Sequence, residues 1–166
     1  MNSVTTRLAR AHDVETIVEL WKELMDFHQA RDRHFTRSPN GPSVFADFVT
    51  EQLHNDDALV LVAEEAGAIV GYCLAVSETH ALVFEKPRHA EIIDLFVCQS
   101  YRRRGIGERL VREVEQWFSR RGFDRIEARI ATRNEVSTEF WCRIGYESYL
   151  ERMFKQLGDR ANGGSG

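Results

Sequence analysis

The sequence predicts an α/β protein in which one mixed β-sheet is flanked by helices. Two kinds of apolar pattern alternate along the chain: short stretches with the period of two or the β-branched runs of strands, and longer stretches with apolar residues three and four apart, as in amphipathic helices. They follow in the order strand, helices, two hairpin strands, strand, helix, strand, helix and strand. The 166 residues suit one domain, which we expect over 1–157, with 158–166 as a flexible tail.

The N-terminal part is expected to form a strand and a long helix. Residues 5–10 alternate enough for a strand, and Asp13 then provides an N-cap for a helix over 14–29. The apolar stripe of this helix is wider than one contact with a sheet requires, because Leu20 and Phe27 extend it. Its outer edge is therefore expected to pack on a second helix, or else to line an acceptor pocket or a subunit contact.

The next part of the chain is expected to form a short helix and a β-hairpin. The two strands meet at Ala66 and Gly67, which suit a tight turn. Gly71 inside the second strand indicates a bulge or a close approach of the backbone. The expected ranges are 30–43 for a polar loop, 45–54 for the helix, and 58–64 and 69–78 for the strands.

The stretch from residue 89 to residue 121 carries the strongest sign of a binding site. A buried strand over 89–97 precedes a glycine-containing turn and an amphipathic helix over 105–121. Gly105 and Gly107 let backbone N–H groups face outward at the start of the helix, where the helix dipole is positive. Three consecutive arginines add charge, so the turn suits a pyrophosphate; the alternative is a surface turn whose arginines are only solvated. A strand over 124–131, a helix over 135–144 and one or two strands over 146–157 complete the chain.

Composition argues against several classes of protein. With 43% hydrophobic and 29% charged residues the chain resembles an ordinary globular protein, and its net charge of −4 argues against a nucleic-acid partner. Three cysteines without a C-x-x-C spacing predict neither disulfides nor a zinc site, and they suit the cytoplasm. No apolar run is long enough to span a bilayer, and the N-terminal residues lack the apolar core of a signal peptide, so we expect no membrane partner.

Two segments, in this order, resemble the GNAT superfamily of acyl-CoA N-acyltransferases. The motif R-x-x-G-x-G at 102–107, after a strand that ends in L-F-V at 95–97, resembles the coenzyme A loop of that family. Residues 134–146, in which an asparagine opens a helix that ends at glycine and an aromatic residue, resemble its second characteristic segment. The spacing fits neither a Rossmann fingerprint nor a P-loop.

The resemblance extends over about residues 7–157 and implies the acyl-CoA N-acyltransferase fold. In that fold the central sheet is mostly antiparallel, but the strand ending at residue 97 and the strand over 125–131 run parallel and splay apart. Unpaired backbone groups at a splay need partners, and the resemblance implies that the pantetheine amides of acetyl-CoA provide them, with no metal. The residues implied to contact the cofactor are Leu95, Phe96, Val97, Arg102, Arg103, Arg104, Gly105, Ile106, Gly107, Glu108, Asn134 and Trp141.

Two carboxylates on the central strand are the candidate catalytic residues. Glu91 stands where some family members place the general base, and a regular strand would put it on the same face as Ile93, Leu95 and Val97. Asp94 would point to the opposite face, where it could bind the substrate or a neighbouring strand. The alternative for both carboxylates is a structural role at a sheet edge.

Trp141 stands where many family members carry a tyrosine that protonates the leaving thiolate. An indole N–H is not an acid at neutral pH, so the proton would come from Cys142, from Tyr146 or from water. We favour water, because a coenzyme A thiolate is a tolerable leaving group. Trp141 is then expected to pack against pantetheine or bound its tunnel, and Asn134 either contacts the cofactor or only caps its helix.

The implied function is transfer of the acetyl group of acetyl-CoA to a primary amine of a small molecule. The alternatives are a protein lysine or N-terminal acetyltransferase and a non-catalytic acyl-CoA-binding regulatory module. The region between the first two strands is implied to shape the acceptor site. Tyr149 and Phe154 would leave an apolar surface on a closing edge strand, so we expect a homodimer whose contact includes one of them.

Overall fold

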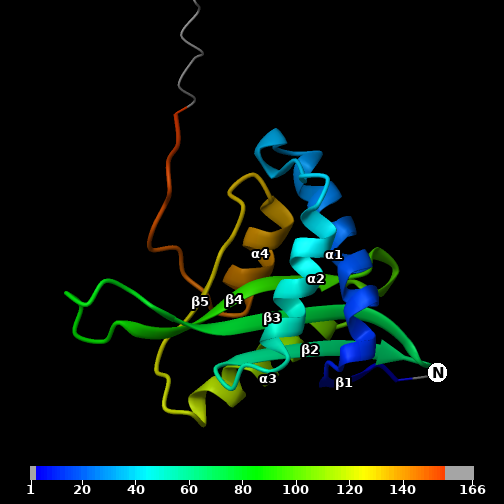
Figure 1. Ribbon diagram of the computed structural model, residues 1–166. Coiled ribbons are helices and arrows are strands. Elements are labelled where there is room, and N and C mark those ends of the chain that lie inside the picture. The colour runs from blue at the N-terminus through cyan, green and yellow to red at the C-terminus, as the bar shows by residue number, and fades with distance from the viewer. Residues whose placement is uncertain (1–2, 156–166) are drawn as a thin grey trace, which may run out of the picture.

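A five-stranded sheet forms the centre of the protein, and helices cover both of its faces (Figure 1). The computed structural model describes residues 3–155. The strands are β1 Thr5–Leu8, β2 Ala58–Glu65, β3 Ala68–Thr79, β4 Arg88–Val97 and β5 Ile126–Ala128, and the helices are α1 Val14–Gln29, α2 Gly41–Gln52, α3 Ile106–Ser119 and α4 Glu135–Arg143. Short 3-10 turns lie at η1 Ala11–Asp13, η2 Arg33–Phe35 and η3 Gln99–Tyr101.

The sheet is antiparallel except at one edge. Its strand order is β1-β2-β3-β4-β5, and neighbouring strands are antiparallel as far as β4. β5 runs parallel to β4, and the two pair only where residues 90–92 face residues 126–128. This arrangement confirms the predicted mixed, mostly antiparallel sheet with one parallel pair.

The sheet separates two hydrophobic cores, which define its α3 face and its α1 face. On the α3 face, α3 and Trp141 of α4 pack against side chains from β2, β3 and β4. On the α1 face, α1 and α2 pack against the alternate side chains of the same strands. The largest fully buried side chains include Leu110 and Phe118 on the α3 face and Ile17, Tyr72 and Leu74 on the α1 face.

Helix α1 packs on the sheet and on α2 at the same time. Leu20 is buried, and the ring of Trp21 stacks on Phe45 of α2 with 4.6 Å between the ring centroids. The second helix therefore accounts for the wide apolar arc of α1, as one of the two sequence-based alternatives required. Asp13 stands at the N-cap position of α1, but its carboxylate bonds to Arg7 and to the Arg10 N–H instead of to the helix.

A β-bulge divides β4 at Ile93. Leu74 of β3 pairs with Asp94, whereas the next residue of β3, Ala75, pairs with Ile92, so Ile93 is an extra residue. Side-chain alternation restarts after the bulge. The prediction that Glu91 shares a face with Leu95 and Val97 was therefore wrong, because a period of two holds only in a regular strand.

The β2–β3 hairpin has the turn that the sequence predicts. Ala66 and Gly67 both have positive φ, at 52° and 84°. A Cβ on Gly71 would lie 2.7 Å from the carbonyl oxygen of Phe96, so only glycine lets β3 approach β4 this closely. The expected close approach of the backbone at Gly71 is confirmed.

The C-terminal part of the chain differs from the prediction. β5 has three residues in place of the expected strand over 124–131, and residues 146–155 form no strand. Leu150 and Met153 in this segment are 78% and 88% exposed, so they lack the sheet neighbours that stabilise a strand. Figure 1 shows the segment, in orange and red, extending beyond the sheet. Residues 156–157 of the expected strand and the expected tail over 158–166 lie outside the described residues.

Candidate active site

The second half of β4 has one edge without a strand partner in the described part of the chain. β5 pairs with residues 90–92 only, while β4 continues to Val97. Side chains of Leu95 and Val97 lie on the α3 face and that of Phe96 on the α1 face. Unpaired strand edges bind extended polar chains through main-chain hydrogen bonds, so this edge can accept the amides of a linear ligand.

The turn that follows β4 exposes backbone N–H groups beside positive charge. Arg103 and Gly105 have left-handed φ values of 64° and 77°, and α3 begins at the next residue. The first N–H groups of a helix have no partner within the helix, and alternating backbone conformations of this kind form anion-binding nests. The turn between β4 and α3 is therefore suited to a phosphate or pyrophosphate.

The three arginines of this turn differ in what they contact. Arg102 donates from Nε to the carbonyl of Val97 at 2.9 Å, and Arg104 donates to the carbonyl of Ser100 at 2.9 Å. Their guanidinium groups thus hold the shape of the turn, while Arg103 is exposed. All three place positive charge at the turn, but only Arg102 and Arg104 also hold its backbone through these hydrogen bonds.

Gly107 allows two helices to approach. A Cβ at this position would meet the ring of Phe140 in α4 at 3.4 Å, so a larger side chain would push α3 away from α4. The neighbouring residues of the first turn of α3 have other duties: Ile106 is buried in the core, and Glu108 forms an ion pair with Arg112. These residues can reach a ligand only through their backbone groups or, for Glu108, by giving up that pair.

Asn134 and Trp141 lie at the two ends of α4 in structural roles. Asn134 is buried and caps the helix, because its Oδ1 accepts from the N–H of Ser137 at 3.2 Å. Trp141 is 5% exposed and packs edge-on against Phe140 and Tyr146, with ring centroids 5.2 Å and 4.8 Å away. Contact of either side chain with a cofactor stays a prediction.

The bulge brings both candidate carboxylates to the α1 face of the sheet. Glu91 pairs with Val76 and Asp94 with Leu74 on β3, and both β3 residues belong to the core of the α1 face. A regular period of two predicts opposite faces, and the bulge at Ile93 is the reason that this prediction is wrong. Glu91 and Asp94 therefore line one surface.

The two carboxylates have different partners. Glu91 is 5% exposed and forms a two-point ion pair with Arg129, whose Nη2 atom lies 2.9 Å from Oε2. Asp94 is half-buried, and the hydroxyl of the buried Tyr72 lies 3.5 Å from its Oδ2. Burial raises the pKa of the Asp94 carboxyl to about 6, although the Tyr72 hydrogen bond acts in the opposite direction. One carboxylate is neutralised by a cation, and the other is not.

Tyr146 is a poor candidate for the acid that protonates a leaving thiolate. Its hydroxyl lies 3.2 Å from Glu115 Oε1, and burial together with that carboxylate raises the pKa of the phenol above its ordinary value. Cys142, the other side-chain option, is exposed on α4.

The loop between α1 and α2 contacts two segments that follow β5 in the chain. Asp32 in the loop lies 3.4 Å from Arg133, which follows β5. The ring of His34 stacks on Phe154 with 5.4 Å between centroids. The loop expected to shape an acceptor site therefore contacts the part of the chain that follows β5.

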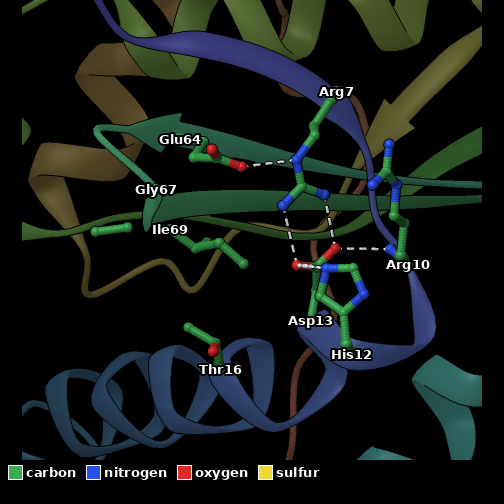
Figure 2. A pocket seen from close by; sticks show the side chains of 9 residues that line it. Arg7, Arg10, His12, Asp13, Thr16, Glu64, Gly67 and Ile69 are labelled. Carbon is green, nitrogen blue, oxygen red and sulfur yellow. Dashed lines mark hydrogen bonds and ion pairs between the residues drawn. The ribbon is translucent and has the colours of Figure 1, made fainter. Parts of the chain in front are cut away.

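A separate hollow of about 630 Å³ lies at the other end of α1 (Figure 2). Figure 2 shows Arg7 between two carboxylates: Nε lies 2.7 Å from Glu64, and NH1 lies 2.7 Å from Asp13. Hydrogen bonds from Arg7 lower the pKa of the Asp13 carboxyl against the effect of burial. This network joins β1, β2 and the start of α1, and its charges are mutually satisfied, so we assign it a structural role.

Sequence reasoning missed Tyr72 and Arg129 as neighbours of the two carboxylates. Tyr72 is separated from Asp94 by 22 residues and Arg129 from Glu91 by 38, so no local spacing connects them. Arg129 could have been inferred only from the parallel pairing of β4 and β5.

Among the described residues, none of the helices combines the length and apolar composition that a membrane crossing requires.

Residues 17–146 match the model of the acetyltransferase (GNAT) family. Mycothiol acetyltransferase of Pseudarthrobacter chlorophenolicus is 35% identical over 71 residues, which are 43% of this chain and 21% of that protein. An uncharacterized N-acetyltransferase of Methanocaldococcus jannaschii is 24% identical over 147 residues, or 89% of this chain and 62% of that protein. The chain thus spans less than two thirds of the length of these two curated relatives.

Solved structures share the fold at low sequence identity. The aminoglycoside N-acetyltransferase AAC(6')-Iy in complex with CoA aligns over 95% of this chain and 96% of its own, with a TM-score of 0.77 and 17% identity. A tetramutant of the BH1408 protein from Bacillus halodurans aligns over 92% and 99%, with a TM-score of 0.81 and 21% identity. These two likenesses establish the fold and nothing finer.

Proposed function

The chain belongs to the acetyltransferase (GNAT) family, whose enzymes use acetyl-CoA as the acetyl donor, and we propose that it acetylates the primary amine of a small molecule. One observation carries the proposal: the unpaired edge of β4 leads directly into the positively charged turn before α3. An extended donor with an anionic end fits these two features in sequence. The donor supplies the acetyl group as a thioester.

The proposed cofactor site combines the edge of β4 with the start of α3. Backbone groups of Leu95, Phe96 and Val97 would bind the pantetheine amides, and the N–H groups from Arg103 to Glu108 would bind the diphosphate. Arg102 would keep the carbonyl of Val97 occupied and leave the inner part of the edge for the ligand. Asn134 and Trp141 would support this site from α4.

The two carboxylates would divide the work on the acceptor. Glu91, held in place by Arg129, would accept a hydrogen bond from the ammonium group on the α1 face. Asp94 would accept the proton from that ammonium, because a base with a pKa near neutrality both exists as carboxylate and releases the proton again. The neutral amine could then attack the acetyl carbon.

The remaining steps need no further side chain. Unpaired backbone N–H groups of β4 could polarise the acetyl carbonyl oxygen as it gains negative charge. The new C–N bond replaces the C–S bond, the second amine proton leaves to solvent, and water protonates the departing thiolate. The bound hydroxyl of Tyr146 and the buried indole of Trp141 support this assignment to water.

A small-molecule acceptor is supported by the names of similar proteins. Mycothiol and aminoglycosides, after which two of them are named, are small molecules. The free thiols of Cys73, Cys98 and Cys142 support a reducing compartment, and we propose the cytoplasm.

We also propose that the protein is a homodimer. Leu150, Met153 and Phe154 are 78%, 88% and 67% exposed, and Tyr149 in the same segment is 59% exposed. Exposed apolar groups that cluster in this way favour burial against a second copy. Light scattering at micromolar concentration should give twice the 19.2 kDa of one chain, and Phe154→Asp should lower the mass while Val44→Asp, at an exposed site of α2, should not. A mass of one chain for the unmodified protein would overturn the dimer.

The acetyltransferase proposal is tested by release of coenzyme A from acetyl-CoA in the presence of a panel of amines. The panel should contain aminoglycosides, amino sugars and polyamines, together with peptides that carry a free lysine or α-amine. We expect turnover with at least one small amine and a loss of turnover in Asp94→Asn. Turnover with peptides alone would favour a protein acetyltransferase. Tight binding of acetyl-CoA without turnover of any amine would favour the regulatory module.

A further inference from the structure

Three side chains of the kinds that bind metals meet where three strands lie side by side. His80 follows the end of β3, His89 is the second residue of β4, and Glu127 is the central residue of β5. Their ligand atoms all lie within 4.8 Å of one another. His80 Nε2 lies 2.8 Å from Glu127 Oε1, and His89 Nε2 lies 3.9 Å from Glu127 Oε2.

The distances between these atoms are close to those of a metal site. Ligands of a tetrahedral zinc ion at about 2.0 to 2.1 Å from the metal are separated from one another by roughly 3.4 Å. The two imidazole rings stack with centroids 3.9 Å apart, and both Nε2 atoms lie near the same carboxylate. His80 lies at the exposed end of the cluster. A tilt of its ring would let the Nε2 atoms of both histidines point to one shared ion.

The groups around the three side chains are those that orient metal ligands. His89 Nδ1 lies 3.4 Å from the carbonyl of Pro87, a contact that leaves Nε2 as the free nitrogen. Glu127 accepts from the hydroxyl of Tyr149 at 2.5 Å and from Nε of Arg125 at 2.6 Å. These hydrogen bonds hold the Glu127 carboxylate in place beside both imidazole rings.

The cluster is buried except on one side. The side chains of His89, Glu127 and His80 are 4%, 13% and 31% exposed, so solvent reaches the cluster past His80. Two imidazoles and one carboxylate with an open fourth position form a donor set that suits zinc and neighbouring divalent transition metals. Magnesium and calcium, which prefer oxygen ligands, are not expected to compete.

From this juxtaposition we infer that His80, His89 and Glu127 form a binding site for one divalent transition-metal ion, with Zn²⁺ as the favoured ion. The ion would replace the direct contact of His80 with Glu127 and connect β3, β4 and β5. β5 has only three residues, so a link of this kind would fix it against the part of β4 with which it pairs. The inference does not depend on the proposed acetyl transfer.

The test uses the full chain and Zn²⁺ alone, without acetyl-CoA or an amine. Equilibrium dialysis followed by metal analysis should give one Zn²⁺ per chain, and saturating Zn²⁺ should raise the melting temperature by about 5 °C or more. His80→Ala and Glu127→Gln should each weaken binding by at least about tenfold. His54→Ala is the matched control, because His54 is an exposed histidine at the end of α2 and should leave binding unchanged.

Two measurements keep a negative result interpretable. Circular dichroism of Glu127→Gln, which preserves the shape of the side chain, checks that the fold is retained. Co²⁺ in place of Zn²⁺ should give the visible absorption of nitrogen and oxygen ligands without the charge-transfer band of a thiolate. A thiolate band, equal binding by wild type and His80→Ala, or less than about 0.2 Zn²⁺ per chain would each overturn the proposal.

Discussion

The two halves of β4 have opposite surroundings, although they belong to one strand. Residues 88–92 have β3 on one side and β5 on the other for most of their length, and Glu91 there is neutralised by Arg129. Residues 94–97, after the bulge, pair with β3 only, and Asp94 there lacks a cationic partner among the described residues. The first half resembles the interior of a sheet, and the second half resembles a binding edge.

The bulge at Ile93 produces this difference. One extra residue changes which side chains face α3, and it places Asp94 on the same face as Glu91. A regular strand would have separated the two carboxylates. Within three residues of β4 the surroundings thus change from a paired strand with a neutralised carboxylate to an unpaired edge whose carboxylate has no cationic partner among the described residues.

The largest expected effect is on turnover by Asp94→Asn. Loss of a general base lowers kcat by about 100-fold or more, while coenzyme A should bind as before because the substitution leaves the backbone of β4 and of the turn before α3 unchanged. In the unmodified enzyme, kcat should fall as pH drops below about 6, where Asp94 becomes protonated, and this limb should vanish in the variant. Steady-state kinetics over a pH series, with an accepted amine, measures both effects.

The same substitution should not destabilise the protein. A carboxyl whose pKa is higher in the folded state than in the unfolded state favours folding at low pH and opposes it once it is ionised, so this cost is present above about pH 6. The asparagine removes it, and the melting temperature at pH 7.5 should stay the same or rise. Asp47→Asn, at an exposed site of α2, is the control for both properties. A melting temperature several degrees lower, or unchanged turnover, would contradict the assignment of Asp94.

The next effect concerns the affinity for coenzyme A. Gly107→Val would place methyl groups against the Phe140 ring, move α3 relative to α4 and shift the N–H groups at the start of α3. We expect the dissociation constant measured by calorimetry to rise at least about tenfold, which is about 1.4 kcal/mol. Gly107→Ala adds only the Cβ that the 3.4 Å contact tolerates, and it should retain most of the affinity. Equal affinities for all three proteins would show that this turn does not bind the cofactor.

A smaller effect is expected from Glu91→Gln in the first half of β4. The variant loses the carboxylate that would accept a hydrogen bond from the amine, so kcat/KM should fall by about tenfold. It also leaves Arg129 without its carboxylate, and the free energy of unfolding should fall by about 1 kcal/mol. Kinetics and urea unfolding on one sample measure the pair of effects. If Glu91→Gln instead kept or raised the free energy of unfolding, as we expect for Asp94→Asn, the two halves of β4 would not differ.

The smallest effect on turnover is expected from Trp141→Phe. If water protonates the thiolate, the variant should keep most of its kcat with coenzyme A bound. Trp141 is buried, so loss of part of its ring should lower the free energy of unfolding by about 1 to 3 kcal/mol. A folded variant that binds coenzyme A but has lost turnover would show that Trp141 takes part in the chemistry.

Local patterns were sufficient for most of the fold. Helix α1 begins and ends at the predicted residues, and the turn at Ala66 and Gly67 has the predicted positive φ values. The turn between β4 and α3 could also be predicted, because the glycines at 105 and 107 and the preceding arginines lie within a few residues of one another. Such features depend on periodicity and turn chemistry, which a single sequence contains.

Features that depend on distant partners could not be predicted. The bulge at Ile93 reflects the pairing with β3, so the prediction that Glu91 and Leu95 share a face was wrong. The apolar residues of 146–155 suggested strands, but a strand requires a neighbour that the sequence does not identify. The cluster of His80 and Glu127 connects residues 47 positions apart, beyond the reach of any motif spacing.

The most direct test of the difference between the two halves of β4 is amide hydrogen exchange with and without coenzyme A. Ligand bound along the free edge and the following turn should slow exchange in peptides that cover residues 93–108. Exchange of residues 88–92 should not change, because β3 and β5 already pair with them. If coenzyme A binds but slows exchange elsewhere, for example around Arg7 and Asp13 in the hollow of Figure 2, the account of β4 is wrong.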